Sequence, residues 1–306
     1  MDLALFTTQM LNGLQLGVLL FLVAAGLTLI FGIMDFINLA HGAFYMIGAY
    51  FCGTVVAVTG SFLLGLLVAL PLTAAVGYAA EVSIARSLYT RDHLDHVLAT
   101  FGLILIADTS VHFFWGAEGM GIPTPWWAQG RVPFAGAEIP VFRLVIVCTG
   151  LAVAVGLWLL VSRTRLGMLI RAGASNRAMV QALGVDIQRL FAIVFAIGAA
   201  MAGLAGLMIA PITEASIGMG NEIIIVAFVV IIIGGIGSIK GAFIGALIVG
   251  VIDTMGRSYL DVLLATFMTS DYAETAAPAL SAMLIYILMA AILVIRPQGL
   301  FPPRTR

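Results

Sequence analysis

Charged residues are scarce in this chain: Asp, Glu, Lys and Arg together make up 9% of its 306 residues. Water-soluble domains carry about 25% charged residues, so this chain has too little polar surface to cover a water-soluble globule. Hydrophobic residues make up 62% of the sequence, and the mean hydropathy is +1.15. The net charge is −1, and no basic-aromatic patch is present that could bind nucleic acid. The composition therefore indicates a polytopic membrane protein.

Motifs for catalysis, metal binding and nucleotide binding are also missing. Cys52 and Cys148 both lie in apolar runs, which argues against a disulfide framework or a metal cluster. The four histidines are not spaced as metal ligands, and Ser, His and Asp form no hydrolase motif. There is no Gly-Lys-Ser or Gly-Lys-Thr sequence, so no P-loop can hold the phosphates of a nucleotide. We therefore expect no enzyme activity and no cofactor in this chain.

Apolar runs of about twenty residues predict an all-α bundle of eight or nine membrane-spanning helices in one domain, residues 1–306. The predicted spans are about 9–33, 37–59, 62–85, 96–115, 142–161, 190–211, 223–238, 241–260 and 279–295. Polar residues and glycines interrupt the first two spans and also the seventh and eighth. These interruptions predict broken or re-entrant helices near 33–41 and 212–240.

A polar, arginine-rich segment at 162–189 stands between two long apolar segments and holds five of the fourteen Lys and Arg residues. Cytoplasmic loops of membrane proteins are enriched in Lys and Arg, so we expect this segment to be cytoplasmic. Strict alternation of nine spans then places the C-terminal tail on the same side. The N-terminus and the loop 116–141 are expected outside.

A short helix is predicted inside this arginine-rich segment. Ser175 can cap its N-terminus, and Gly184 can end it in the left-handed conformation. Met179, Ala182 and Leu183 have the spacing i, i+3 and i+4, which makes a narrow apolar stripe. A helix this short is marginal alone in water, so something must cover the stripe. The alternatives are a groove in a partner protein and the lipid interface, and the lack of an aromatic residue favours the partner protein.

Several segments together carry a resemblance to a known family. They are Phe31-Gly32, Phe36–Gly42, Ile170-Arg171-Ala172, Asn176-Arg177, Ala182–Val185, Ile197–Gly203, Gly234–Ser238, Gly241-Ala242 and the tail Arg296–Leu300. In these segments the chain resembles the permeases of branched-chain amino acid ABC importers, the LivH family. The similarity covers most of the chain and is weakest in the loop 116–140. Lys240 departs from the family pattern, in which a neutral residue, often proline, is expected.

The resemblance implies a permease subunit of an ATP-driven importer for branched-chain or related small amino acids. It implies a multi-pass protein of the bacterial cytoplasmic (inner) membrane, which would pair with a second, homologous permease, as a heterodimer. Two cytoplasmic ATP-binding subunits and a periplasmic solute-binding protein would complete the assembly. The family's coupling helix fits a groove on the ATP-binding subunit. That role falls here on Arg171, Asn176, Arg177, Leu183 and Gly184, which makes 162–189 the expected coupling loop.

The interrupted spans are also the sequence pointer to a transport pathway. Asn38 and His41 flank the first interruption, and Gly235, Gly237 and Ser238 form the second. We expect these five residues to line the pathway. For Asn38 and His41, local capping of a helix end is an equal alternative; for the glycines, the alternative is close helix packing.

Ionisable residues inside a predicted span suggest an alternative function. Asp108 and His112 are four residues apart and share one helix face. They could relay protons in a proton-coupled secondary transporter, or they could form a hydrogen-bonded pair that faces the bundle interior. The second interpretation is favoured because His112 lies close to the outer interface.

Two further groups of charges lie toward the outer side. Asp253 and Arg257 are also four residues apart, and we expect them to form a structural ion pair. Glu214 and Glu222 flank a predicted outer turn. They are interpreted as solvated loop charges, with contact to a solute-binding protein as the alternative.

Overall fold

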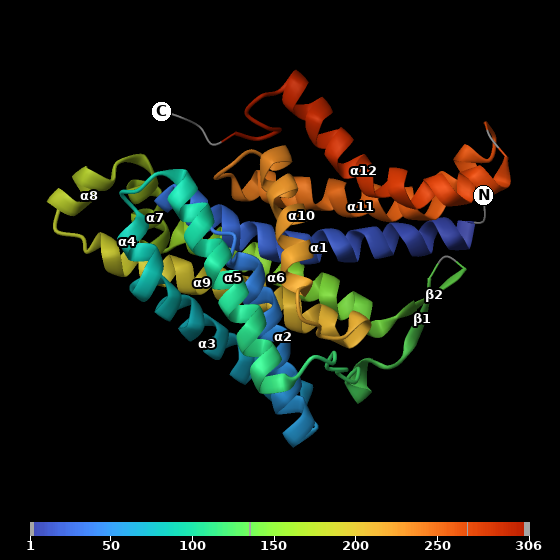
Figure 1. Cartoon of the computed structure of the whole chain (residues 1–306), viewed down its shortest axis with the longest axis horizontal. Coiled ribbons are helices and arrows are strands. Elements are labelled where there is room, and N and C mark those ends of the chain that lie inside the picture. The colour runs from blue at the N-terminus through green and yellow to red at the C-terminus, as the bar shows by residue number, and fades with distance from the viewer. Residues whose placement is uncertain (1–2, 135, 268, 303–306) are drawn as a thin grey trace.

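The computed structural model describes residues 3–134, 136–267 and 269–302. Within these residues the chain is almost entirely helical, and eight helices are long and apolar enough to cross a membrane (Figure 1). A small two-stranded antiparallel hairpin interrupts this pattern in the loop after the fourth long helix. The prediction of an all-α polytopic membrane bundle is confirmed.

The elements follow one another as a chain of long helices joined by short links. In order they are α1 (Leu3–Met34), α2 (His41–Thr59), α3 (Phe62–Ala80), the π-helical turn η1 (Glu81–Ala85), α4 (Arg86–Leu88), α5 (His93–Trp115), the 3₁₀ turn η2 (Trp126–Ala128), β1 (Arg131–Phe134), β2 (Ala137–Pro140), α6 (Val141–Arg163), α7 (Arg165–Ser175), α8 (Arg177–Ala182), α9 (Ile187–Thr213), α10 (Met219–Gly234), α11 (Ile239–Leu264) and α12 (Ser270–Ile295).

The bundle has two distinct ends. The start of α1 and the β1–β2 hairpin lie at one of them, which we call the hairpin end (Figure 1). The other carries α7 and α8, which together we call the elbow. At this elbow end, Gly173 of α7 approaches Ile33, and Gly237 approaches Gly32. The described N-terminal residues and the elbow therefore lie at opposite ends of α1.

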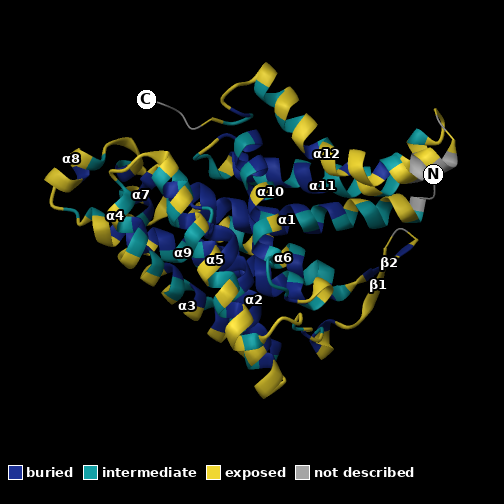
Figure 2. Ribbon diagram, viewed as in Figure 1, coloured by how far each residue is buried: buried dark blue, intermediate teal, exposed yellow. Residues whose placement is uncertain are grey.

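Helix α1 forms the centre of the bundle. Residues 17–30 are all buried (Figure 2), and they contact helices on several sides. A helix that is hydrophobic all round is one that neighbouring elements enclose, and this sequence has no polar stripe. The exposed apolar side chains lie instead on peripheral helices such as α5, α6 and α12, where lipid is the expected neighbour.

Glycines bring the backbones of the central helices into contact. A side chain at Gly26 would collide with the carbonyl of Gly198, and one at Gly48 would collide with Gly203. Gly206 packs directly on the carbonyl of Tyr45. Small residues at such positions let membrane helices approach closely, and dispersion contacts replace the missing hydrophobic driving force. The run 198–206 is therefore the seam between α9 and the first two helices.

Both predicted helix breaks are present. Helix α1 ends at Met34, Asp35 has a positive φ of 52°, and α2 begins at His41. The Nε2 atom of His41 lies 3.1 Å from the carbonyl oxygen of Val23, which is well before the end of α1. The chain thus turns back into the bundle before α2 begins, as a re-entrant segment does.

The second break corrects one of the predicted spans. Helix α9 ends at Thr213, and the next helix is Met219–Gly234 rather than 223–238. This helix, α10, has 16 residues and is shorter than the helices that can cross a membrane unaided. It begins inside the bundle, where Gly220 packs on the backbone of Gly42 in α2.

We predict that Gly206→Leu strongly reduces the stability of the folded bundle. The new side chain would overlap the backbone of Tyr45, and overpacking of this kind costs about 1–3 kcal/mol or more. Gly156→Leu is the matched control because nothing lies within 4 Å of a side chain at this position on α6. Thermal unfolding of the detergent-solubilised variants measures the difference. Equal unfolding temperatures for the two variants would contradict the glycine seam.

Candidate functional site

A large cavity lies between the central helices and the second helix break. It has a volume of about 690 Å³ and is lined by residues of α1, α2, α9, α10, α11 and α12 and of the link between α9 and α10. This volume falls within the range of roughly 300–1,000 Å³ that is common for small-molecule pockets. We call it the central cavity.

The wall of the central cavity combines an apolar surface with charges of both signs. The apolar side chains are Leu16, Leu20, Ile209, Ile217, Met219, Ile223, Val226, Val249 and Ile285. The charged ones are Glu214, Glu222, Asp253 and Arg257, and the lining also includes Tyr45, Thr213, Ser216 and Tyr286. A few polar groups on a mostly apolar wall are typical of sites that bind a small polar ligand.

Asp253 and Arg257 form the expected ion pair, and the pair belongs to the cavity wall. The Nε atom of Arg257 donates to Oδ2 of Asp253 at 2.9 Å, one turn apart on α11. The Asp253 side chain is 14% exposed, whereas that of Arg257 is 63% exposed. The carboxylate thus holds the base of the guanidinium and leaves its outer part accessible.

Glu214 and Glu222 are not only loop charges, because both line the central cavity. Glu214 directly follows α9 and has a φ of 69°, a strained conformation for a residue with a side chain. Glu222 lies in the first turn of α10 and is exposed. The sequence signal that could have placed them was the helix break itself, since residues at a break inside a bundle face its interior cavity.

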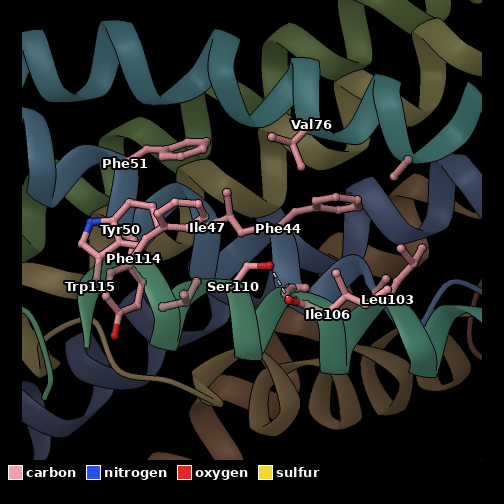
Figure 3. A pocket seen from close by; sticks show the side chains of 15 residues that line it. Phe44, Ile47, Tyr50, Phe51, Val76, Leu103, Ile106, Ser110, Phe114 and Trp115 are labelled. Carbon is pink, nitrogen blue, oxygen red and sulfur yellow. Dashed lines mark hydrogen bonds between the residues drawn. The ribbon is translucent and has the colours of Figure 1, made fainter. Parts of the chain in front are cut away.

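A second cavity is chemically different. It measures about 280 Å³ and lies between α2, α3 and α5, with an almost wholly apolar lining (Figure 3). Phe44, Tyr50 and Trp115 line it, and the hydroxyl of Ser110 donates to the carbonyl of Ile106 in its own helix at 2.6 Å. It offers no charged side chain to a polar solute, so the central cavity is the better candidate site.

The elbow contains the predicted short helix, with one shift at its start. Ser175 ends α7, and Asn176 caps α8 by accepting a hydrogen bond from the backbone N–H of Met179 at 2.9 Å. Both residue types are good caps, so the sequence alone did not separate them. Gly184 has a φ of 86° and ends the helix as expected, with Val185 N–H donating to the carbonyl of Val180.

The apolar stripe of the elbow is uncovered in this chain. The side chains of Met179 and Leu183 are 58% and 76% exposed, and Ala182 is also exposed. Arg171 is exposed as well. Arg177 differs from these residues, because its guanidinium lies over the ring of Phe191 in α9, 5.5 Å from the centroid. A cation above an aromatic ring in this way fastens α8 to α9.

Comparison with known proteins places the chain in a family. Residues 9–293 match the model of the family described as branched-chain amino acid transport system / permease component. The chain belongs to this family. It is 29% identical to the high-affinity branched-chain amino acid transport system permease protein LivH of Escherichia coli K12, over 94% of this chain and 95% of that protein. It is 31% identical to BraD of Pseudomonas aeruginosa, a permease protein of the same description, over 84% of this chain and 90% of BraD. No solved structure matches the chain.

A series of aromatic contacts connects the elbow of this permease to the first helix break. Phe191 contacts Tyr89 edge to face with a centroid distance of 5.1 Å, and Tyr89 contacts Phe36 at 6.0 Å. Phe36 lies in the first helix break. Together with Arg177, these rings form a continuous contact from α8 to the break. We call the four residues the aromatic bridge.

A buried carboxylate anchors this bridge. Glu81 has no exposed side-chain surface and accepts hydrogen bonds from the Tyr89 hydroxyl at 2.8 Å and from Arg86 at 3.0 Å. Burial of the ring and the hydrogen bond to Glu81 raise the pKa of the Tyr89 phenol. Removing one partner from such a network leaves a buried polar group without its hydrogen bond.

The five predicted pathway residues lie elsewhere in this permease. Asn38 and His41 are fully buried at the first break, and Gly235, Gly237 and Ser238 form the tight link between α10 and α11. None of them lines the central cavity as described. Ser238 caps α11 by accepting from the N–H of Gly241, and Gly235 packs against the C-terminal tail. Their assignment to the pathway remains a prediction.

Asp108 and His112 do not form a recorded pair in the described structure. The Asp108 carboxylate instead accepts a hydrogen bond from the Asn221 amide of α10 at 3.1 Å. His112 is exposed on the surface of α5. The contact joins α5 to the start of α10, so Asp108 has a structural partner outside its own helix.

We predict that Tyr89→Phe makes the permease less sensitive to alkaline pH. Because the folded state raises the phenol pKa, it favours the protonated form, and this stability is present below pH 10 and is lost as the pH rises above it. The variant retains the ring contacts with Phe36 and Phe191 but has no ionisable group. The temperature of thermal unfolding should fall less between pH 8 and pH 10.5 for Tyr89→Phe than for the unmodified protein. An equal drop in both proteins would contradict the buried, hydrogen-bonded phenol.

Proposed function

We propose that this chain is a permease subunit of an ATP-driven importer that moves branched-chain or related small amino acids across the bacterial cytoplasmic membrane. A second, homologous permease would complete the transmembrane part, as a heterodimer. Two cytoplasmic ATP-binding subunits would supply the energy, and a periplasmic solute-binding protein would deliver the substrate. Family membership and the names of the similar proteins support this assignment.

The uncovered stripe of α8 is the observation on which the ATP-driven mechanism rests. Met179 and Leu183 are exposed apolar residues on a short, well-capped helix at the elbow end. The sequence has no P-loop, so nucleotide energy must come from another subunit. A groove on an ATP-binding subunit would cover this stripe. Arg171, Asn176, Arg177, Leu183 and Gly184 are the residues that we assign to the coupling.

The path of the motion follows from the elements that α8 contacts. Arg177 fastens α8 to Phe191 near the start of α9, and α9 runs without interruption to Thr213 at the central cavity. A rigid-body displacement of this helix would therefore change the cavity at its far end. Transport needs two arrangements of packed helices, and ATP must favour one over the other.

The lining of the central cavity is suited to a small amphiphilic substrate. Its aliphatic wall suits a branched side chain, and its charges of both signs suit a zwitterion. The proton-coupled alternative rested on Asp108 and His112, and Asp108 is hydrogen-bonded to Asn221 instead. The cavity and the exposed stripe favour the ATP-driven importer over this alternative.

We predict that Leu183→Asp lowers leucine uptake by the complete transporter at least tenfold. The substitution puts a charge into the apolar contact with the ATP-binding subunit, but Leu183 is exposed and contributes little to the fold of this chain. The control is Val58→Asp, at an equally exposed apolar position near the end of α2. Uptake of radiolabelled L-leucine, normalised to the amount of permease in the membrane, measures the effect. Full uptake by Leu183→Asp would contradict the coupling role.

We predict that leucine uptake requires ATP and does not require a proton gradient. In right-side-out membrane vesicles loaded with ATP, a protonophore should change leucine uptake by less than twofold, and depletion of ATP should abolish leucine uptake. Asp108→Asn and His112→Gln should each support leucine uptake when equal amounts of folded permease are compared. Uptake that stops with the protonophore while ATP is retained would support the secondary transporter instead.

A further inference from the structure

The central cavity is lined by charges of both signs. Charged side chains inside a membrane bundle are costly, and those that persist usually mark a substrate or ion pathway. Here a positive and several negative side chains line one cavity, on α10 and α11 and at the end of α9. These side chains form two groups. One can bind an anionic group of a ligand, and the other can bind a cationic group.

Arg257 forms the first part. Its Nε donates to Asp253, and no protein partner is recorded for its two Nη nitrogens in the described structure. A guanidinium held at its base presents its remaining donors as a planar fork, which matches the geometry of a carboxylate. Asp253 therefore orients Arg257, and the outer donors remain free for an anionic group.

Glu222 and Tyr45 form the second part. Glu222 is exposed in the first turn of α10 and has no recorded salt bridge in the described residues. Tyr45 is 6% exposed and lines the cavity from α2, and no hydrogen bond is recorded for its hydroxyl. The ring of Tyr45 is thus buried, and its hydroxyl can accept a hydrogen bond from a ligand in the cavity. An ammonium group could donate to both oxygens.

We propose that the central cavity binds the zwitterionic backbone of an aliphatic amino acid, with Arg257 on the carboxylate and Glu222 with Tyr45 on the ammonium group. The apolar residues of α1 and α10, among them Leu20 and Ile223, cover the aliphatic side chain. The proposal rests on the proposed function and adds the site and the groups that it recognises. A solute without charged groups could pair neither with Glu222 nor with the outer donors of Arg257, so the site favours zwitterions over uncharged sugars and amides.

The test uses the complete transporter in liposomes, with L-leucine as the probe. The measured quantity is leucine imported per ATP hydrolysed, normalised to the amount of assembled complex. Arg257→Gln and Glu222→Gln should each lower this ratio at least tenfold, and Tyr45→Phe should lower it several-fold. Arg257→Lys should restore part of the ratio because it restores the positive charge. Asp261→Asn is the matched control, since Asp261 is exposed on the same helix outside the cavity.

The possible outcomes separate the site from the function. If the unmodified complex imports leucine but Arg257→Gln and Glu222→Gln keep the ratio within twofold, the site assignment is wrong and the proposed function stands. Equal losses in Arg257→Lys and Arg257→Gln would also contradict recognition by charge. If the unmodified, assembled complex imports no leucine in the presence of ATP, the proposed function itself is wrong.

Discussion

A polypeptide backbone inside a membrane cannot leave its hydrogen-bonding groups facing lipid, and this constraint decides where the helices can break. In the described residues, the breaks after Met34 and after Thr213 each have a part that is buried by protein, Asn38 and His41 at the first and Ala215 at the second. At the first, the ring of His41 contacts the carbonyl of Val23. At the second, Ala215 exchanges backbone hydrogen bonds with Met120 of the loop between α5 and the hairpin. The partial burial of these breaks brings polar groups into an otherwise apolar bundle.

Close backbone contact makes that burial possible. Gly26, Gly48 and Gly206 let α1, α2 and α9 cross without intervening side chains, which brings the start of α2 against the middle of α1. The same geometry leaves α9 as one uninterrupted helix between the aromatic bridge and the central cavity. The elbow and the cavity are thus at opposite ends of a single element, which is a simple arrangement for transmitting a displacement.

The sequence was sufficient for features that depend on local composition. Apolar runs predicted the spans, polar interruptions predicted both breaks, and Gly184 predicted the end of α8. The cap at Asn176 was missed by one residue, because Ser175 is equally suited to that position. The glycines of 234–237 interrupt an apolar segment, which is also the pattern expected of a transport pathway. In the structure they pack against α11 and the C-terminal tail.

The central cavity was beyond sequence reasoning for a different reason. Tyr45 on α2 is distant in the chain from Glu222 on α10 and Arg257 on α11, and no local pattern states that these helices converge. Glu222 and Glu214 resemble ordinary loop charges until the second break is placed inside the bundle. The pairing of Asp253 with Arg257 was visible from their spacing, but its position in a cavity was not.

In the proposed mechanism, nucleotide-driven movement of the elbow reshapes the central cavity. Ser216 lines this cavity, and Cys148 is an exposed native cysteine that must first be removed. The most direct measurement is the rate at which Ser216→Cys, in a Cys148→Ser background, reacts with a membrane-impermeant maleimide in the assembled transporter. We expect a rate that changes at least fivefold when ATP is hydrolysed and the ADP is trapped with vanadate. Identical rates with and without trapped nucleotide would contradict it.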